Sequence, residues 1–440
     1  MKYKKYPSYK DSGVEWLGEI PSEWGIKKLK YISSIQTGST PLTSNDSYFS
    51  DEIGIPWIKP DELNNLVPIK TSKKFLTEKG KNVSRIIKKD SVLVCGIGTI
   101  GKFGIAGVDL TTNQQINSVT FNNKLNFNYG KFLIASSQQE MDKFSNGNVV
   151  KILNTESQKN IDYPFPSFEE QQQIANFLDK ATAKIDTLIE KQTKQIELLK
   201  EKRQAVISHA VTKGINPNVP MKDSGVEWLG EIPEHWQVVP LRYLGNLQNG
   251  ISKGAEFFGL GFPFINYGDI YKNDSLPKDI KGLANTSFED RRLYSVKRGD
   301  VFFTRTSETI DDIGIASTCL ETISNATFSG FTIRFREFSI NLFPEFSRYQ
   351  FRSGYSQRFF EKEMNLVTRA SLGQDLLKRL HVMIPPFQEQ QQIANYLDDK
   401  TSKIDTLIEK SKKSIELLKE KRTALISACV TGKIDVREAV

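Results

Sequence analysis

Two stretches of the chain carry apolar residues at alternating steps of three and four, or at multiples of these steps. The first stretch contains Ile174, Leu178, Ala181, Ile185, Leu188, Ile196, Leu199 and Val206, and the second contains Ile393, Leu397, Ile404, Leu407, Ile415, Leu418 and Leu425. This spacing predicts two long helices, each with a narrow apolar seam flanked by charges, as in a coiled coil. Each rod, about 45 residues and roughly 65 Å long, is too long for one neighbouring domain to cover. The two helices are therefore expected to pair with each other.

Start and stop signals bound both helices. Ser167 with Glu170 three residues later forms a capping-box pattern, and the pair Pro385-Pro386 precedes the second helix. Gly214 and Gly432 follow the last periodic residues, as C-terminal stops do. The helical segments are therefore placed at 167–214 and 386–440, the second with a C-terminal tail.

The remaining segments, 1–166 and 215–385, contain short β-rich runs such as "DSVLVCGIG" and "FTIRFRE", broken by Gly, Pro, Asn and Asp. Each is expected to form one globular domain of mixed character. The predicted fold class is α+β, with two such domains separated by a pair of long antiparallel coiled-coil helices.

The antiparallel expectation comes from an internal repeat. The residues "KDSGVEWLGEIP" occur at 10–21 and again at 222–233, 212 positions later. The run "EQQQIAN" occurs at 170–176 and at 389–395, an offset of 219, and similarity continues along both helices. The segments between these near-identical parts diverge. A duplication of this kind predicts a pseudo-two-fold molecule with an internal repeat, in which the two helices run in opposite directions.

Charge suggests a polyanionic partner. The 440-residue chain has a net charge of +8 and a pI near 9.0. Residues 1–168 carry 22 Lys and Arg against 16 Asp and Glu, whereas residues 215–385 carry 20 of each. Twelve of the bases in the second segment are Arg, but Arg85 is the only one in the first. If both domains bind the same polymer, they are expected to read it with different side chains; should that polymer be DNA, the second domain is expected to read the more guanine-rich part.

The motifs that resemble enzyme sites each lack a feature that the corresponding chemistry needs. The glycines Gly96, Gly98 and Gly101 form a GxGxxG pattern after an apolar strand, but no amphipathic helix follows them, so a strand–loop–strand hairpin is the better interpretation. "IPPF" at 384–387 lacks the side-chain acceptor that an amino-methyltransferase needs at its first position. The three cysteines and three histidines show no metal-ligand spacing and no CxxC pair. No catalytic, cofactor-binding or metal site is expected, and buried thiols are expected in place of disulfides.

No apolar run approaches the ~18 residues of a membrane span, and the first residues, "MKYKKYPSYK", lack an apolar signal core. A cytoplasmic location without membrane contact is expected.

The whole arrangement resembles the specificity subunit of type I restriction–modification enzymes. The tag "SGVEWLGEIPEHW", the helix opening "EQQQIANYLD" and the run "KIDTLIEK…IELLKEKR" carry the resemblance. It implies that the two divergent segments are target recognition domains, each reading one half of a bipartite, asymmetric site in double-stranded DNA. It also implies that the repeats dock two methyltransferase subunits, and through them restriction and translocase subunits. S-adenosylmethionine, ATP and Mg²⁺ would then be used by those partners, and this chain would be non-catalytic with no cofactor of its own.

Side chains able to reach base edges or phosphates mark candidate DNA contacts. In the first domain these are Lys59, Lys102, Asn113, Gln114 and Gln115; in the second they are Asn266, Arg305, Ser307 and Arg369. Charges repeated on both helices beyond what the seam requires are candidate subunit-docking residues, namely Glu190, Lys191, Arg203, Glu409, Lys410 and Arg422. The helix pair is also expected to set the spacing between the half-sites.

Two other functions remain open at this point. The chain could be a self-contained adenine methyltransferase, which the missing acceptor in "IPPF" disfavours. It could also be a coiled-coil adaptor without DNA specificity.

Overall fold

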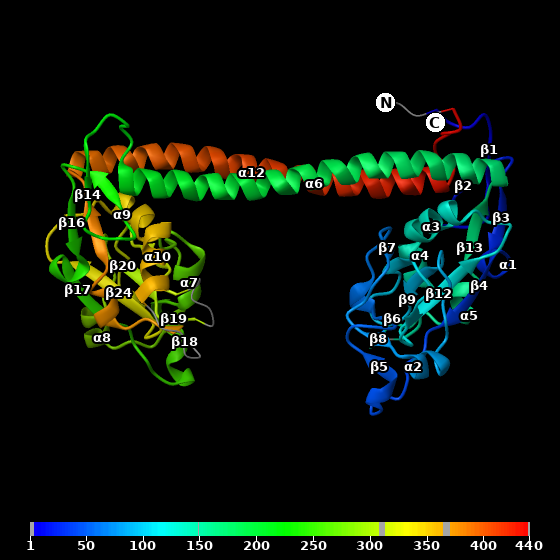
Figure 1. Cartoon of the computed structure of the whole chain (residues 1–440), viewed down its shortest axis with the longest axis horizontal. Helices are drawn as coiled ribbons and strands as arrows, with labels where there is room; N and C mark the ends of the chain where they lie inside the picture. The colour runs from blue at the N-terminus through cyan, green and yellow to red at the C-terminus, as the bar shows by residue number, and fades with distance from the viewer. Residues whose placement is uncertain (1–3, 148, 308–312, 364–369, 439–440) are drawn as a thin grey trace. The chain divides into compact units, whose positions relative to one another are not determined.

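A computed structural model describes residues 4–147, 149–307, 313–363 and 370–438. The chain divides into two compact units, which are described separately. The first unit comprises residues 1–192 and 413–440, and the second comprises residues 193–412 (Figure 1). Each unit therefore contains one α+β domain together with parts of both long helices.

The first unit contains two larger sheets and two two-stranded sheets. A five-stranded sheet has the order β4 (Ser33–Thr37), β12 (Ile116–Phe121), β9 (Val92–Cys95), β10 (Phe103–Ala106), β7 (Pro68–Ile69), and a four-stranded sheet has the order β11 (Thr111–Thr112), β6 (Ile55–Ile58), β8 (Phe75–Leu76), β5 (Phe49–Ser50). Every residue of β9 is buried, as expected for a central strand apolar on both faces. The other elements are β1 (Tyr9–Asp11), β2 (Glu19–Pro21), β3 (Gly25–Lys28), β13 (Asp162–Phe165), α1 (Leu29–Ile32), α2 (Glu78–Asn82), α3 (Phe127–Ser136), α4 (Gln138–Lys143), α5 (Thr155–Lys159) and the 3-10 turns η1 (Asp46–Tyr48) and η2 (Pro60–Glu62).

The second unit follows the same plan with shorter sheets. A four-stranded sheet has the order β17 (Gly245–Asn249), β24 (Thr332–Glu337), β20 (Val301–Thr304), β22 (Ala316–Thr318), and a three-stranded sheet has the order β19 (Leu283–Ala284), β18 (Phe258–Ile265), β23 (Thr327–Phe328). The other elements are β14 (Met221–Asp223), β15 (Glu231–Pro233), β16 (Gln237–Pro240), β21 (Thr306–Ser307), β25 (Ala370–Ser371), β26 (His381–Ile384), α7 (Tyr267–Lys272), α8 (Phe288–Leu293), α9 (Pro344–Phe351), α10 (Gly354–Glu363), α11 (Gln374–Leu377) and the turns η3 (Leu241–Tyr243) and η4 (Ala255–Phe257).

Helices α6 (Phe168–Lys213) and α12 (Phe387–Val430) match the two long helices expected from the periodic pattern. Ser167 Oγ accepts a hydrogen bond from the Glu170 backbone N–H at 3.3 Å, and Gly214 and Gly432 adopt positive φ angles of 77° and 71°. Pro385 and Pro386 lie between β26 and α12. The predicted start and stop residues therefore coincide with the ends of the two helices, and of the capping box the Ser167 half is formed.

In each unit a part of α6 shares a core with a part of α12. In the first unit, Ile174 and Leu178 belong to the same apolar cluster as Leu425 and Cys429. In the second unit, Ile207 and Val211 belong to the same cluster as Ile393 and Leu397. The early part of one helix therefore packs with the late part of the other in each unit.

The predicted seam is wrong at one repeated position. Leu188 and Leu407 are 46% and 45% exposed, whereas Ile408 is only 7% exposed. An α-helix has 3.6 residues per turn, so a stripe spaced at 3.5 rotates about 20° per heptad around the helix. After several turns the residue that follows the expected one is therefore buried instead, as Ile408 is in place of Leu407.

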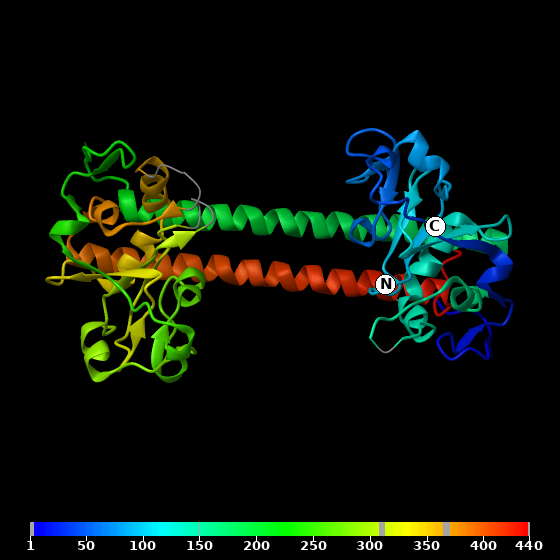
Figure 2. The same cartoon turned by 90° about the horizontal axis from the view of Figure 1, so that it is seen from below.

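Both ends of the described chain lie in the first unit (Figure 2). The Lys4 ammonium lies 2.6 Å from a carboxylate oxygen of Glu438, and the Lys433 ammonium donates to the backbone carbonyls of Leu17 (2.9 Å) and Glu19 (2.6 Å). The tail after α12 is therefore fastened to the N-terminal repeat tag.

Candidate nucleic-acid interface

Four loops meet at one edge of the first unit. The Gly38 N–H, just after β4, donates to the Ile116 carbonyl at 2.9 Å, and the Asn113 N–H donates to the Ile58 carbonyl at 3.1 Å. The Gly96 N–H, just after β9, donates to the Gln115 carbonyl at 2.8 Å. These bonds hold the loops after β4, β6 and β9 against the turn that leads into β12.

The second unit has an equivalent for each of these three backbone hydrogen bonds. Gly250 donates to the Thr332 carbonyl (3.4 Å), Ser329 to the Ile265 carbonyl (3.0 Å) and Arg305 to the Phe331 carbonyl (3.0 Å). Residues in equivalent places can therefore be paired although the two domain sequences diverge. The pairs are Gly38 with Gly250, Lys59 with Asn266, Gly96 with Arg305, Asn113 with Ser329, and Gln115 with Phe331. We refer to these positions and their immediate neighbours as the loop edge of each unit.

Four of the five candidate DNA contacts of the first domain, Lys59 and residues 113–115, belong to its loop edge, and the fifth, Lys102, is bonded to it through the Pro60 carbonyl. Lys59 is exposed and directly follows β6, and its ammonium lies 5.0 Å from the centroid of the Trp57 ring. The Lys102 ammonium donates to the Pro60 carbonyl at 2.7 Å, which ties the loop after β9 to the loop after β6. Hence Lys59 has the freer ammonium, and Lys102 also fastens two loops together.

The three amides of the first domain have different surroundings. Asn113 is only 8% exposed and bonds to Gln115 through both ends of its side-chain amide. Gln114 is exposed, and its side-chain oxygen contacts the hydroxyl of Thr40. Gln114 and Gln115 can reach outward, whereas Asn113 acts within the turn.

In the second domain, Asn266 and Arg305 also lie on the loop edge. Asn266 is exposed and is the N-cap residue of α7. Arg305 is partly exposed, and its Nη1 donates to the Gly330 carbonyl at 3.5 Å. Ser307 lies in β21, whose partner strand is β25, but its side chain is outside the described residues, and so is the whole of Arg369.

Phe331 is a loop-edge residue that nothing in the sequence singles out. The residue is 64% exposed, and its carbonyl accepts a hydrogen bond from the Arg305 N–H. Apolar residues in a β-rich segment are ordinarily assigned to the core, so only the three-dimensional neighbourhood marks it. A Cβ on the preceding residue, Gly330, would come within 2.0 Å of Ser252 Oγ, so a larger residue there would require the Ser252 side chain to move.

The glycine-rich stretch is a hairpin, as expected. β10 pairs antiparallel with β9, with Phe103 opposite Val94, and Gly98 and Gly101 adopt positive φ angles of 84° and 77°. The equivalent strands β20 and β22 also pair antiparallel. No helix N-terminus follows the glycines to receive a phosphate, so the dinucleotide interpretation has no structural support in this part of the chain.

The described residues contain no group of three or more His, Cys, Asp or Glu that could hold a metal ion. The three cysteines are free and buried, and burial raises the pKa of the Cys319 and Cys429 thiols to about 12. Within the described ranges, no helix is long and apolar enough to cross a membrane.

Two of the candidate docking residues are engaged inside the chain. Arg203 Nε lies 3.0 Å from an Asp405 carboxylate oxygen, and Arg422 Nε lies 3.0 Å from an Asp186 carboxylate oxygen. These ion pairs sit at equivalent places of the repeat, one in each unit, and link α6 to α12. The ion pairs between α6 and α12 therefore explain why both repeats carry an arginine here. Contact of these arginines with a partner subunit stays a prediction.

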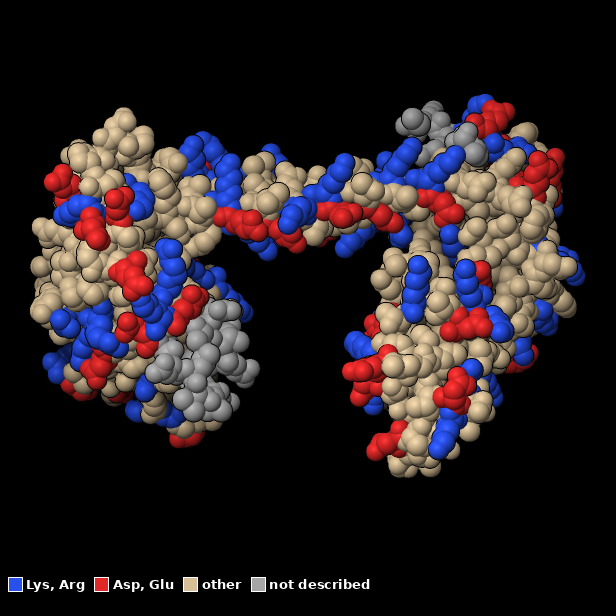
Figure 3. All heavy atoms as spheres, viewed as in Figure 1, with Lys and Arg blue, Asp and Glu red and all other residues tan. Residues whose placement is uncertain are grey.

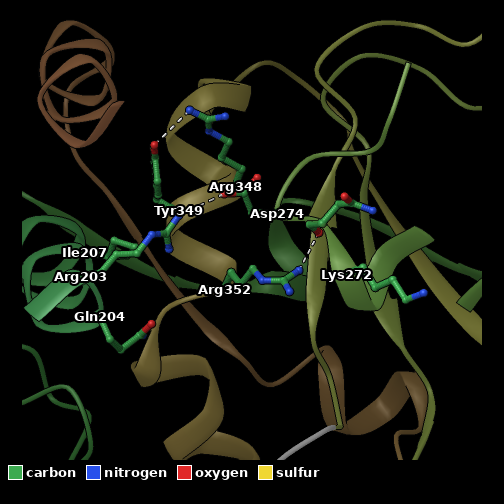
Figure 4. Close-up of a pocket in the computed structure, with 9 residues that line it drawn as sticks. Arg203, Gln204, Ile207, Lys272, Asp274, Arg348, Tyr349 and Arg352 are labelled. Carbon is green, nitrogen blue, oxygen red and sulfur yellow. Dashed lines mark hydrogen bonds and ion pairs between the residues drawn. The ribbon is translucent and has the colours of Figure 1, made fainter. Parts of the chain in front are cut away.

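Arg203 also lines a cavity of about 380 Å³ in the second unit (Figure 4). Its guanidinium lies 3.9 Å from Asp274, and Arg348 is paired with Asp398. Arg352 donates to four backbone carbonyls, including that of Asn273 at 2.6 Å. Arg203 thus links α6 to the residues after α7 and to α12, while Arg348 and Arg352 link α9 and its end to α12 and α7.

The other four docking candidates remain on the surface. Glu190, Lys191, Glu409 and Lys410 are exposed, and Glu409 pairs with Lys412 at 2.7 Å along the same helix. Figure 3 shows Lys and Arg interspersed with Asp and Glu along the exposed surface of the long helices. These four residues are accessible to a partner.

The fold and the loop edges define a protein of two homologous α+β recognition domains, each joined to a long helix. A family model described as the type I restriction modification DNA specificity domain matches twice, over residues 21–198 and 233–417, and the chain belongs to this family.

Similar proteins agree with this assignment. The MjaIX specificity subunit of Methanocaldococcus jannaschii is 27% identical over 327 residues, covering 71% of this chain and 72% of that protein. The MjaVIII specificity subunit of the same organism is 23% identical and covers 95% and 94% of the two chains.

Two solved structures share the fold. A chain from a structure on complex assembly and conformational transition of the type I R-M system has a TM-score of 0.69 at 15% identity and covers 93% of this chain and 98% of its own length. The HsdS subunit from Thermoanaerobacter tengcongensis has a TM-score of 0.53 at 15% identity and covers 94% and 98%.

Proposed function

We propose that this chain is the non-catalytic DNA-recognition subunit of a type I restriction–modification complex, in which each loop edge reads one half of a bipartite, asymmetric DNA site. The observation that carries the proposal is the pair of loop edges. The same backbone hydrogen bonds present different side chains in the two units: a lysine and amides in the first, an asparagine, an arginine and a phenyl ring in the second.

The chemistry of these side chains suits the major groove of DNA. Amides and guanidinium groups recognise base edges, and lysines bind phosphates and fix the orientation of the protein on the duplex. Two domains that recognise different DNA sequences independently require the same backbone arrangement with different side chains on it. The net charge of +8 favours DNA in general but supplies no sequence preference.

The long helices are proposed to pair as an antiparallel coiled coil, to dock two methyltransferase subunits and to set the half-site spacing. The cores that α6 and α12 share in each unit, and the repeated pairs Arg203–Asp405 and Asp186–Arg422, support the pairing. Restriction and translocase subunits would join through the methyltransferases, and S-adenosylmethionine, ATP and Mg²⁺ would be bound by those partners.

The test is methylome mapping in cells that express the chain with its cognate methyltransferase subunit. A split motif with a non-specific spacer is expected. A continuous palindrome would contradict the proposal, and methylation without sequence preference would favour a non-specific adaptor. Expression of the chain alone provides the control, because methylation without the partner would make the chain itself a methyltransferase.

A further inference from the structure

The turn that leads into the last central strand is built identically in the two units. In the first unit, the Gln115 N–H donates to Asn113 Oδ1 (3.1 Å), and the Ile116 N–H donates to the Asn113 carbonyl (3.3 Å). In the second, the Phe331 N–H donates to Ser329 Oγ (3.3 Å), and the Thr332 N–H donates to the Ser329 carbonyl (3.0 Å). Asn and Ser are residues that close such turns with their side chains. Gln115 and Phe331 therefore occupy one and the same position.

Hydrogen bonding fixes which way the Gln115 amide points. A backbone N–H can only donate, so the Asn113 atom that faces it must be the oxygen, and the other end of the Asn113 amide is the NH₂ group. That NH₂ group lies 2.8 Å from the Gln115 side chain, so the atom it meets there must be the oxygen Oε1. Gln115 thus turns its own NH₂ group outward, and no described residue accepts from it.

We propose that this shared position determines one base of each half-site, with Gln115 reading a hydrogen-bond acceptor and Phe331 reading an apolar group. The inference rests on the DNA-recognition function proposed above. An outward NH₂ group matches the O6 and N7 atoms of guanine or the O4 atom of thymine in the major groove. It disfavours the two-bond contact with adenine, which needs the amide oxygen as well. An exposed phenyl ring matches the thymine methyl group.

Asn113 is the positioning residue in this arrangement. It is 8% exposed and holds the Gln115 amide in one orientation without needing to touch DNA. Asn113→Asp keeps the oxygen that closes the turn but removes the donor that orients Gln115. The carboxylate presents an acceptor in place of that donor, so the Gln115 amide should turn its NH₂ group toward the aspartate and its oxygen outward, which changes the preferred base without loss of the fold.

The experiment is methylome mapping of variants of the full chain, expressed with the cognate methyltransferase subunit. Gln115→Glu reverses the outward group to an acceptor, and one base of the first half-site should change toward cytosine, whose N4 amino group donates. Asn113→Asp should shift that same base in the same direction, and Phe331→Ala should reduce discrimination at one base of the second half-site about tenfold.

The two strands supply matched controls. Phe338, 63% exposed, follows the opposite end of β24, as the exposed amide Asn123 follows the opposite end of β12. Phe338→Ala and Asn123→Asp should leave both half-sites unchanged.

The outcomes separate the inference from the function. If the wild-type chain yields a split motif but Gln115→Glu and Phe331→Ala leave it unaltered, the inference is overturned and the function stands. If the wild type yields no split motif, the function itself fails. Should Gln115→Glu abolish methylation, Gln115→Ala decides: a motif relaxed at one base supports the inference, and an unaltered or lost motif counts against it.

Discussion

At the scale of single residues, the repeated run "EQQQ" is explained by anchoring. Its first Gln is Gln171 in one repeat and Gln390 in the other, and both are fully buried. Gln390 accepts from the Phe343 N–H (2.7 Å) and donates to the carbonyls of Asn341 and Pro385 (2.9 Å each). Gln171 makes the equivalent bonds in the first unit, accepting from the Asn126 N–H at 2.8 Å. These side chains fix the start of each long helix to its domain.

Gln390→Leu should therefore destabilise the second unit. The change leaves the Phe343 N–H and two carbonyls without partners, and one such group costs about 1–3 kcal/mol. Denaturant unfolding of the full chain should show an earlier transition. Gln391→Ala, at an exposed neighbouring position, serves as the control and should change little. Equal stability of both variants would show that the buried bonds contribute nothing.

Glu337 gives a pH-dependent prediction. Burial raises the pKa of its carboxyl group to about 7, and one oxygen, Oε1, has no partner among the described residues. The folded state therefore binds this proton more tightly than the unfolded chain, whose pKa is near 4.5. Stability from this group is full below pH 4.5 and is lost as the pH rises through 7.

Glu337→Gln removes the charge, so its Tm relative to the wild type should rise between pH 5 and pH 8. Glu227, whose pKa is lowered by its pair with Lys362, provides the control, because Glu227→Gln should bring no such gain. A constant Tm difference for Glu337→Gln across this range would contradict the assignment.

At the scale of elements, the charges of α6 and α12 separate into two groups. Arg203 and Arg422 join the helices within the chain, whereas Glu190 and Lys191 are exposed. Reversal of the exposed pair, Glu190→Lys with Lys191→Glu, should weaken assembly with the methyltransferase and leave Tm unchanged. Size-exclusion chromatography of the co-expressed complex measures this.

For comparison, Arg203→Ala removes the ion pair with Asp405 and should lower Tm by a small amount, since partly exposed ion pairs contribute about 0.2–1 kcal/mol. Unchanged two-to-one assembly of the doubly reversed variant would exclude Glu190 and Lys191 from the docking surface.

At the scale of the whole molecule, the proposed pairing of α6 and α12 predicts that the length of these helices sets the spacing between the two half-sites. Insertion of four residues after Leu199 and after Leu418 adds about 6 Å to each helix. Because B-DNA rises about 3.4 Å per base pair, the non-specific spacer should grow by one or two base pairs. Four residues also rotate the helix by about 40° beyond a full turn, close to the rotation of DNA per base pair.

The two half-sites themselves should stay the same, because the insertions alter no loop edge. Methylome mapping of the insertion variant measures the spacer. Full activity with an unaltered spacer would show that the helices do not set the distance between the half-sites.

The sequence by itself determined the features that repeat along the chain. The two long helices, their start and stop signals and the duplication depend on local spacing and on identity between segments, which are visible without tertiary contacts. The Gly96–Gly101 hairpin was also predictable, because an apolar run followed by glycines and no amphipathic period excludes a helix. The family followed from the same repeated segments.

Only the tertiary structure decided what the divergent domains share. Gln115 and Phe331 have no chemical similarity, and their equivalence appears only through the bonds that Gly96 and Arg305 make with their carbonyls. Likewise, the sequence marks Arg203 only as a charged helix residue, and its pairing with Asp405, 202 positions away, is visible only in the structure. Such contacts join residues far apart in sequence, so no local pattern of apolar and polar positions indicates them. Tertiary packing alone decides whether a polar side chain is buried and hydrogen-bonded, pairs the two long helices, or is exposed and able to contact DNA.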